Sequence, residues 1–149
     1  MKTSSIMHYW RPSNEIGEVL GFEKLEYTFN KVKLIYQIIK SGKLLDKYVC
    51  FTFNEGVLSL RFSDECHRSE LNEFPFLDSL KPNSNKREEL WPLYKMENSE
   101  FLDWYLSKEL GPGFGDEITD FVFVDQENVL EILSSYEPIV TIHNSLDDI

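Results

Sequence analysis

The sequence has few cysteines and no long hydrophobic run, and each shortage excludes a class of protein. Two cysteines, Cys50 and Cys66, can form one pair at most, which is too few for a disulfide-rich secreted domain. The longest apolar runs are four residues, as in "FVFV", whereas a membrane-spanning helix needs roughly 20 residues. No apolar stretch of signal-peptide length follows Lys2. We therefore expect a cytoplasmic protein with no membrane segment.

Basic residues are scarce in the second half of the chain. The whole sequence holds 15 Lys and Arg against 26 Asp and Glu, for a net charge of -11. Residues 76–149 carry five of these bases and 16 of the acids, so the entire excess lies there. A surface of this sign argues against nucleic acid as a partner and attracts cationic proteins. Solubility alone is the other explanation of an acidic composition.

The chain does contain enough apolar and aromatic residues for one globular domain. Hydrophobic residues make up 42% and aromatic residues 14% of the 149 positions, and a chain of this length forms a single domain with one core. A polar segment at 81–89 is typical of a surface loop. We predict an α+β fold over residues 1–149, with a mainly antiparallel sheet and helices packed on one side of it.

Hydrophobic periodicity gives the expected elements. Two runs, "KYVCFTF" and "VLSLRFSD", flank Gly56 and predict a β-hairpin. Residues 22–41 fit a helix that ends at Gly42, although they also alternate with period two and so leave strands open. The other expected elements are a helix over 99–110, a strand over 118–124, a helix over 126–136 and a strand over 138–143. The last three allow a parallel crossover.

Three glycines in five residues open the segment "GPGFGDEITD", residues 111–120. A phosphate-binding loop follows a strand and precedes a helix, but these glycines follow the expected helix and precede a strand. Pro112 removes an N–H donor, and the acids that follow would repel a triphosphate. Their spacing does not fit a calcium loop either. We therefore predict no nucleotide, metal or other cofactor here, and an acidic loop that ends the helix.

The sequence contains no recognisable catalytic motif. His8, His67 and His143 lie in no nucleophile elbow, zinc motif or kinase signature. Cys66 has suitable chemistry, but the acids around it disfavour the reactive thiolate. We predict that the protein is not an enzyme. A hydrolase or transferase built around Cys66, His67 or His143 is the alternative.

Aromatic and acidic residues are interleaved in "ELWPLYKMENSEFLDWY", residues 89–105. Trp and Tyr are common anchors of protein interfaces, and carboxylates pair with Arg and Lys of a partner. An aromatic stripe at helical spacing is more often core, so we expect the apolar stripe of the helix over 99–110 to be buried. Trp104 falls outside that stripe and is the aromatic residue most available to a partner.

A small acidic α+β chain with few cysteines and no catalytic motif resembles the bacterial immunity proteins of contact-dependent growth inhibition and related polymorphic toxin systems. The segments that carry this resemblance of type are "NSEFLDWYLSKE", "GFGDEITD" and "FVFVDQENVLEIL". It implies a non-catalytic protein that binds and neutralises a cognate toxin, often a cationic nuclease, with carboxylates in place of the substrate phosphates. A general protein–protein adaptor is a further alternative.

The residues expected to contact a cationic partner are acidic or aromatic and lie in the last third of the chain. They are Glu100, Asp103, Trp104, Asp116, Glu117, Asp120, Asp125 and Glu127. Asp125 also fits the N-terminal cap of the helix expected over 126–136.

Overall fold

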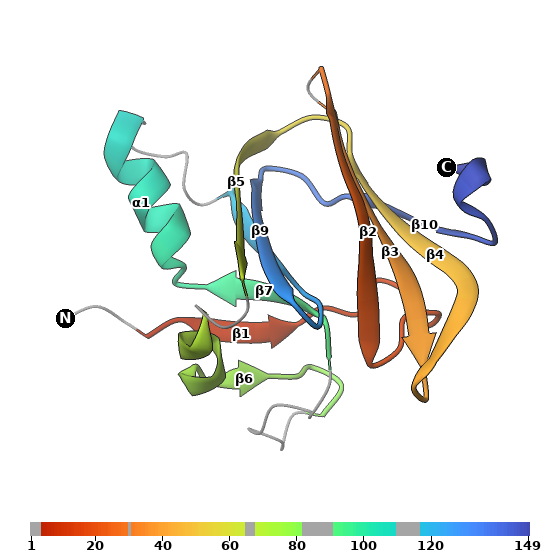
Figure 1. Cartoon of the computed structure of the whole chain (residues 1–149). Coiled ribbons are helices and arrows are strands. Elements are labelled where there is room, and N and C mark those ends of the chain that lie inside the picture. The colour runs from red at the N-terminus through yellow and green to blue at the C-terminus, as the bar shows by residue number, and fades with distance from the viewer. Residues whose placement is uncertain (1–3, 30, 65–67, 82–90, 110–116) are drawn as a thin grey trace.

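Two β-sheets packed face to face make up most of the molecule (Figure 1). The computed structural model describes residues 4–29, 31–64, 68–81, 91–109 and 117–149. Within those ranges there is one α-helix, α1 (Glu100–Glu109), and it covers the outer face of the larger sheet. Two short 3-10 helices, η2 (Ser69–Glu73) and η4 (Leu146–Asp148), complete the described elements. None of the described helices has the length and hydropathy to cross a membrane.

Both sheets are mainly antiparallel. The larger one contains, in spatial order, β5 (Val57–Asp64), β9 (Asn128–Ser134), β8 (Thr119–Val124), β7 (Leu93–Glu97), β1 (Ile6–Tyr9) and β6 (Phe76–Leu77). The smaller one contains β10 (Ile139–His143), β4 (Lys43–Phe53), β3 (Lys31–Lys40) and β2 (Val19–Thr28). Among the described strands, only the short β1–β6 pair is parallel. The antiparallel prediction is confirmed, but the fold contains more strand and less helix than we expected.

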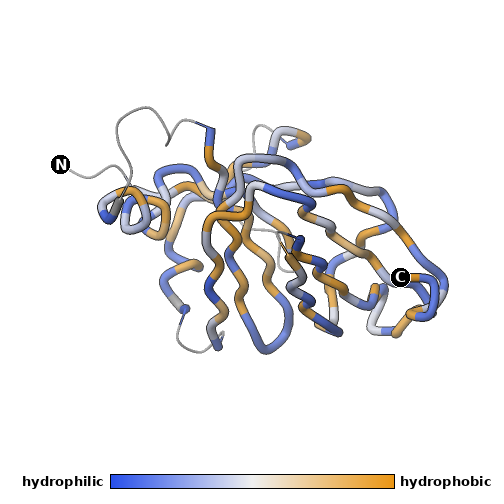
Figure 2. The backbone as a smooth tube through the Cα atoms, turned by 90° about the horizontal axis from the view of Figure 1, so that it is seen from above, coloured by the Kyte–Doolittle hydropathy of each residue, from blue (hydrophilic) through white to orange (hydrophobic). Residues whose placement is uncertain are grey.

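An aromatic core fills the space between the sheets. Alternate residues of each strand point inward, and the ring of Phe123 lies 5.0 Å from that of Phe51, 5.9 Å from Trp10 and 6.1 Å from Tyr36. All four side chains are buried. In Figure 2 the central strands alternate between hydrophobic and hydrophilic residues, whereas the turns between them are hydrophilic.

The helix predicted over residues 22–41 is wrong, because this segment forms the β2–β3 hairpin. Val32, Leu34, Tyr36 and Ile38 are at most 1% exposed and all face the other sheet. The period-two alternation was therefore the correct signal. Glycine at position 42 does not end a helix; with φ of +74° it forms the tight β3–β4 turn.

The predicted hairpin around Gly56 is wrong in its pairing. Both strands exist, but β4 pairs with β3 and β10 of the smaller sheet, whereas β5 pairs with β9 of the larger one. The turn thus carries the chain from one sheet to the other. Gly56 has φ of +82°, and a Cβ added there would lie 2.5 Å from the ring of Tyr136, so both the backbone conformation and the packing require glycine.

The helix predicted over residues 126–136 is also wrong, because β9 occupies this position. Five consecutive residues from Val129 to Leu133 are at most 1% exposed, and a strand buried on both faces has a continuous apolar pattern that periodicity alone does not distinguish from a helix. Asp125 does not cap a helix. Its Oδ1 accepts hydrogen bonds from the backbone N–H groups of Glu127 (2.7 Å) and Asn128 (2.9 Å), which closes an antiparallel β8–β9 turn in place of a parallel crossover.

Candidate partner-binding surface and the ionic cluster beneath it

The first turn of α1 is fixed by Ser99, which caps the helix. Its Oγ accepts a hydrogen bond from the backbone N–H of Leu102 (3.0 Å) and donates one to Oδ2 of Asp120 on β8 (2.6 Å). Glu100 and Asp103 follow in the first turn, where the helix dipole favours negative charge. The predicted helix over 99–110 is therefore confirmed, and one side-chain contact connects its start to the centre of the larger sheet.

One side of α1 packs on the outer face of the larger sheet. Phe101 is 4% exposed and forms a small core with Ile118 and Leu133, against which Leu102, Tyr105 and Leu106 are partly buried. This is the apolar stripe that the helical spacing predicts. The guanidinium of Arg61 lies 4.6 Å from the ring centroid of Phe101, a distance at which cation–π attraction contributes.

The opposite side of α1 is open to solvent and carries Glu100, Asp103 and Trp104. Trp104 is 52% exposed, and its ring stacks on that of Phe101 with centroids 6.0 Å apart. The indole is therefore held in one orientation by a buried neighbour while much of its surface remains accessible. An ordered, half-exposed Trp beside carboxylates has the properties of an interface anchor.

An acidic groove borders this side of the helix. It has a volume of about 280 Å³ and is lined by the N-terminal segment at Ser4 and Ser5, the Glu73–Pro75 segment that follows η2, and the start of α1. Glu73, Glu100 and Asp103 are the acidic residues among those that line it. Ser5 Oγ donates to the backbone oxygen of Asn98 (2.8 Å) and so attaches the N-terminal segment to the helix start.

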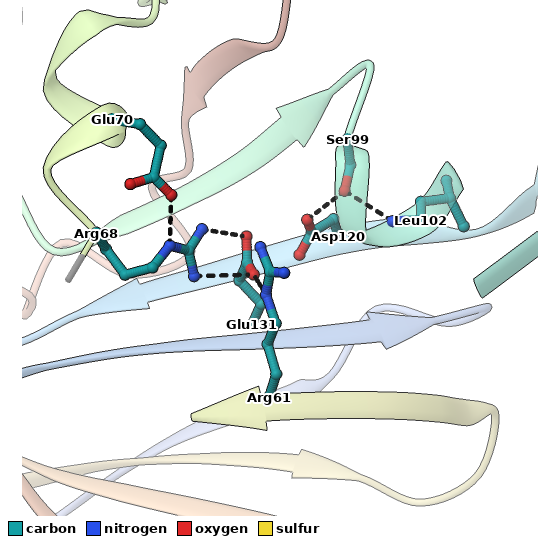
Figure 3. A network of polar contacts seen from close by, with 7 residues as sticks. All are labelled: Arg61, Arg68, Glu70, Ser99, Leu102, Asp120 and Glu131. Carbon is teal, nitrogen blue, oxygen red and sulfur yellow. Dashed lines mark hydrogen bonds and ion pairs between the residues drawn. The ribbon is translucent and has the colours of Figure 1, made fainter. Parts of the chain in front are cut away.

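A buried ionic cluster lies on the same face of the sheet, centred on Glu131 (Figure 3). Glu131 is 0% exposed. Arg61, directly opposite on β5, donates from Nε to Oε2, and Arg68 donates from Nη1 to Oε2 (3.2 Å) and from Nη2 to Oε1 (3.3 Å). Arg68 Nε also donates to Glu70 (2.6 Å). Burying one carboxylate costs several kcal/mol, and these two guanidinium groups offset that cost.

The pKa values of Arg68 and Asp120 are among those that these contacts shift. Burial alone would lower the pKa of Arg68, but hydrogen bonds and charge from Glu131 and Glu70 raise it overall. For Asp120, burial raises the pKa well above its ordinary value of 3.8, and the negative charge of Glu131 raises it further. The hydrogen bond from Ser99 and the charge of Arg61 lower the pKa of Asp120 by less. The fold therefore favours the protonated form of Asp120.

The structure describes seven of the eight predicted contact residues and separates them into those on α1, those exposed near the ends of β8, and those that are buried. Glu100, Asp103 and Trp104 lie together on α1, as expected. Glu117 is exposed just before β8, and Glu127 is exposed in the turn after β8, at the opposite end of that strand. Asp116 lies outside the described residues.

Asp120 and Asp125, in contrast, are not part of an exposed acidic surface. Asp120 is 0% and Asp125 8% exposed. The first is covered by α1, and the second accepts the hydrogen bonds of the β8–β9 turn. Both acids were expected at the contact surface, with a helix cap as the alternative for Asp125, but an acid on the inward or helix-covered side of a strand is used within the fold.

Sequence reasoning missed Glu73 and Glu131. The first lies far from the last third of the chain and reaches the groove only through the fold. The second carried a usable signal: in "VLEIL" a single acid interrupts a continuous apolar strand, and a charge in such a position must be paired. Trp91, whose burial the sequence left open, is buried, with Nε1 donating to the backbone oxygen of Trp10 (3.2 Å) and Arg11 stacked 4.4 Å from its ring centroid.

The candidate catalytic residues do not come together within the part of the chain that is described. Cys66 and His67 lie outside it. His8 is on β1 beside Glu97 (3.8 Å), whereas His143 is on β10 of the other sheet and contacts Thr141 Oγ1 (2.7 Å). Among the described residues there is no group of three or more His, Cys, Asp or Glu arranged to hold a metal ion.

Comparison with known proteins gives no match: no family model fits the chain, and neither a curated protein nor a solved structure matches it. The case for a function therefore depends on the geometry and charge of the described residues.

Proposed function

We propose that this protein is a non-catalytic inhibitor that binds a cationic protein partner through the exposed side of α1. The observation that carries the proposal is Trp104, which is 52% exposed yet held by stacking on Phe101. Glu100 and Asp103 flank it and continue into a groove that also contains Glu73. An aromatic anchor surrounded by carboxylates is complementary to a surface rich in Arg and Lys.

The net charge of -11 supports the same partner class. Opposite charge raises the rate at which two proteins meet, and it does so most at low salt, because the Debye length is about 8 Å at physiological ionic strength. Trp104 and the groove then supply the short-range contacts that slow dissociation.

The proposed contact set is narrower than the one expected from sequence. It consists of Glu73, Glu100, Asp103 and Trp104, and it omits the buried Asp120 and Asp125. The resemblance to bacterial immunity proteins supports a toxin, most naturally a basic nuclease, as the cationic partner. Carboxylates of the groove would then take the place of the phosphates that such an enzyme binds.

Affinity capture with two matched variants tests the proposal. The contact variant combines Glu100→Lys, Asp103→Lys and Trp104→Ala. The control variant makes the same charge changes and also removes one exposed aromatic side chain on the smaller sheet, with Glu23→Lys, Asp46→Lys and Tyr27→Ala, where Tyr27 is 65% exposed. Each immobilised protein is exposed to extract of its native cells at low and at physiological salt, and bound proteins are identified by mass spectrometry.

We expect wild type and control to retain one basic protein in about equimolar amount, and the contact variant to lose it. The purified captured protein should then lose its toxic or nucleolytic activity when wild type is added. Equal capture by the contact variant would show that the exposed side of α1 is not part of the interface. Capture of only acidic or neutral proteins by the wild type would contradict the proposal that the partner is cationic.

A further inference from the structure

The charged groups described around Asp120 contain no excess of bases that could pair with it. Glu131 lies beside Asp120 on the neighbouring strand β9, Arg61 of β5 and Arg68 both pair with Glu131, and Arg68 also pairs with Glu70 in η2. Ser99 and the exposed Glu100 approach from α1, and β7 places Met96 directly opposite, with Tyr94 on the same face. Arg61 and Arg68 are thus already matched by Glu70 and Glu131, and Glu100 adds a third carboxylate. An ionised Asp120 would add a negative charge with no further cation among the described residues at this site.

The hydrogen bonds of Asp120 fit a neutral acid. Its Oδ2 accepts from Ser99 (2.6 Å), whereas its Oδ1 is fully buried and has no hydrogen-bond partner among the described groups. Both guanidinium groups within the cluster already bind Glu131. Figure 3 shows the two carboxyl groups on neighbouring strands, with Asp120 between Glu131 and the start of α1. A proton on Oδ1 would turn an unmatched acceptor into a donor on the side of Glu131.

We propose that Asp120 is an uncharged carboxylic acid in the folded protein and that its proton holds α1 on the larger sheet, so that the helix is attached more firmly at mildly acidic pH than at higher pH. The connection is direct, because the oxygen of Ser99 that caps α1 is the one that binds Asp120. The proposal concerns how α1 is held and does not require any partner.

The direction of the pH effect follows from the pKa of Asp120 in the two states of the helix. With α1 in place, burial and Glu131 raise this pKa well above 3.8. With α1 released, Asp120 meets water and its pKa returns to the ordinary range. Between the two pKa values, the state with α1 attached therefore binds one more proton than the released state. The free energy that favours attachment is fully present below the ordinary pKa of an aspartate and is lost as pH rises through the raised pKa of Asp120. Between these two pKa values, the equilibrium constant for release of α1 rises about tenfold per pH unit.

Hydrogen exchange of the α1 amides measures this equilibrium. Peptides covering residues 100–109 would be followed between about pH 5 and about pH 8, with rates corrected for the intrinsic pH dependence of exchange. In wild type we expect the opening constant to rise about tenfold per pH unit until Asp120 ionises in the folded protein. In Asp120→Asn, which keeps an oxygen acceptor for Ser99 and carries no charge, we expect no such rise.

Asp103→Asn is the matched control, because it removes an exposed carboxylate from the same helix and should keep the wild-type slope. The proposal is overturned if wild type shows no slope, or if Asp120→Asn keeps it. Carboxyl ¹³C NMR of wild type gives a second readout, which does not depend on whether any variant folds. Asp120 should stay protonated at the pH where exposed aspartates ionise, about pH 4. If Asp120 ionises together with them, the proposal is refuted. Neither readout involves a partner, so they can fail while the contact surface stands.

Discussion

The two faces of the larger sheet are held by different kinds of interaction. The inner face packs against the smaller sheet mainly through aromatic and aliphatic side chains such as that of Phe123. The outer face holds α1 through a small apolar core and the hydrogen bond from Ser99 to Asp120, and the start of η2 through the paired charges of Arg68 and Glu131. Apolar burial is non-directional and tolerant, whereas buried ion pairs depend on every partner being present. The inner face should therefore set the stability of the fold, and the outer face should set where α1 lies.

The largest loss is expected from the inner face. Phe123→Ala removes a ring that contacts Trp10, Tyr36 and Phe51, and it should reduce the free energy of unfolding by about 4 kcal/mol. Phe123→Leu, which keeps most of the volume, should cost about 1.5 kcal/mol or less. Urea unfolding followed by circular dichroism measures both. A loss below about 1 kcal/mol for the alanine variant would show that the aromatic core does not dominate stability.

Breaking the ionic cluster should cost slightly less. Glu131→Gln leaves Arg68 with one carboxylate partner and leaves one of the two guanidinium charges of the cluster without a compensating carboxylate. We therefore expect the free energy of unfolding, measured in urea, to fall by about 3 kcal/mol. Glu137→Gln is the matched control, because Glu137 pairs with Lys95 on the surface and should change stability by no more than about 0.5 kcal/mol. Equal effects of the two variants would mean that the cluster is solvated rather than buried.

The cap of α1 should contribute less again. Ser99→Ala removes the acceptor for the Leu102 amide and the donor to Asp120, with an expected cost of about 1.5 kcal/mol. Hydrogen exchange should show the loss concentrated in α1. Ser107→Ala on the exposed side of the same helix, where the hydroxyl bonds only the Trp104 backbone oxygen, should leave protection unchanged. Uniform loss of protection over both sheets would contradict a local role for Ser99.

The smallest effect is expected at Trp104, although it is the same residue type as the buried Trp91. Trp104→Ala should change the free energy of unfolding by about 0.5 kcal/mol or less, since an exposed indole gives up little burial. Trp91→Ala should cost about 4 kcal/mol. Thermal unfolding of the pair gives the comparison. A large loss at Trp104 would mean that the residue serves the fold and not a partner.

Local signals in the sequence were enough for α1 and for strands β8 and β10. Asn98 and Ser99 precede a clear apolar stripe, and Pro138 begins the last strand. The pairing of β4 with β3 and of β5 with β9 was out of reach, because a glycine turn indicates a reversal of the chain but not which strand receives it. For β9, burial on both faces removed the alternation that would have identified a strand.

The candidate surface was predictable only in part, for a related reason. Glu100, Asp103 and Trp104 share a helix face that spacing can give. Glu73 joins them through tertiary structure. Asp120 is withdrawn from the surface because β8 turns it toward α1 and Glu131. Charge counting identified the acidic region correctly but did not separate the acids that face solvent from those that hold the fold together.

The central claim is that the exposed side of α1 is complementary to a cationic protein. The most direct measurement is the dissociation constant of the purified captured partner for the contact variant and for the charge-matched control, at physiological salt. We expect the contact variant to bind at least about 100-fold more weakly than wild type, and the control to stay within about threefold. Equal dissociation constants for wild type and the contact variant would contradict the account.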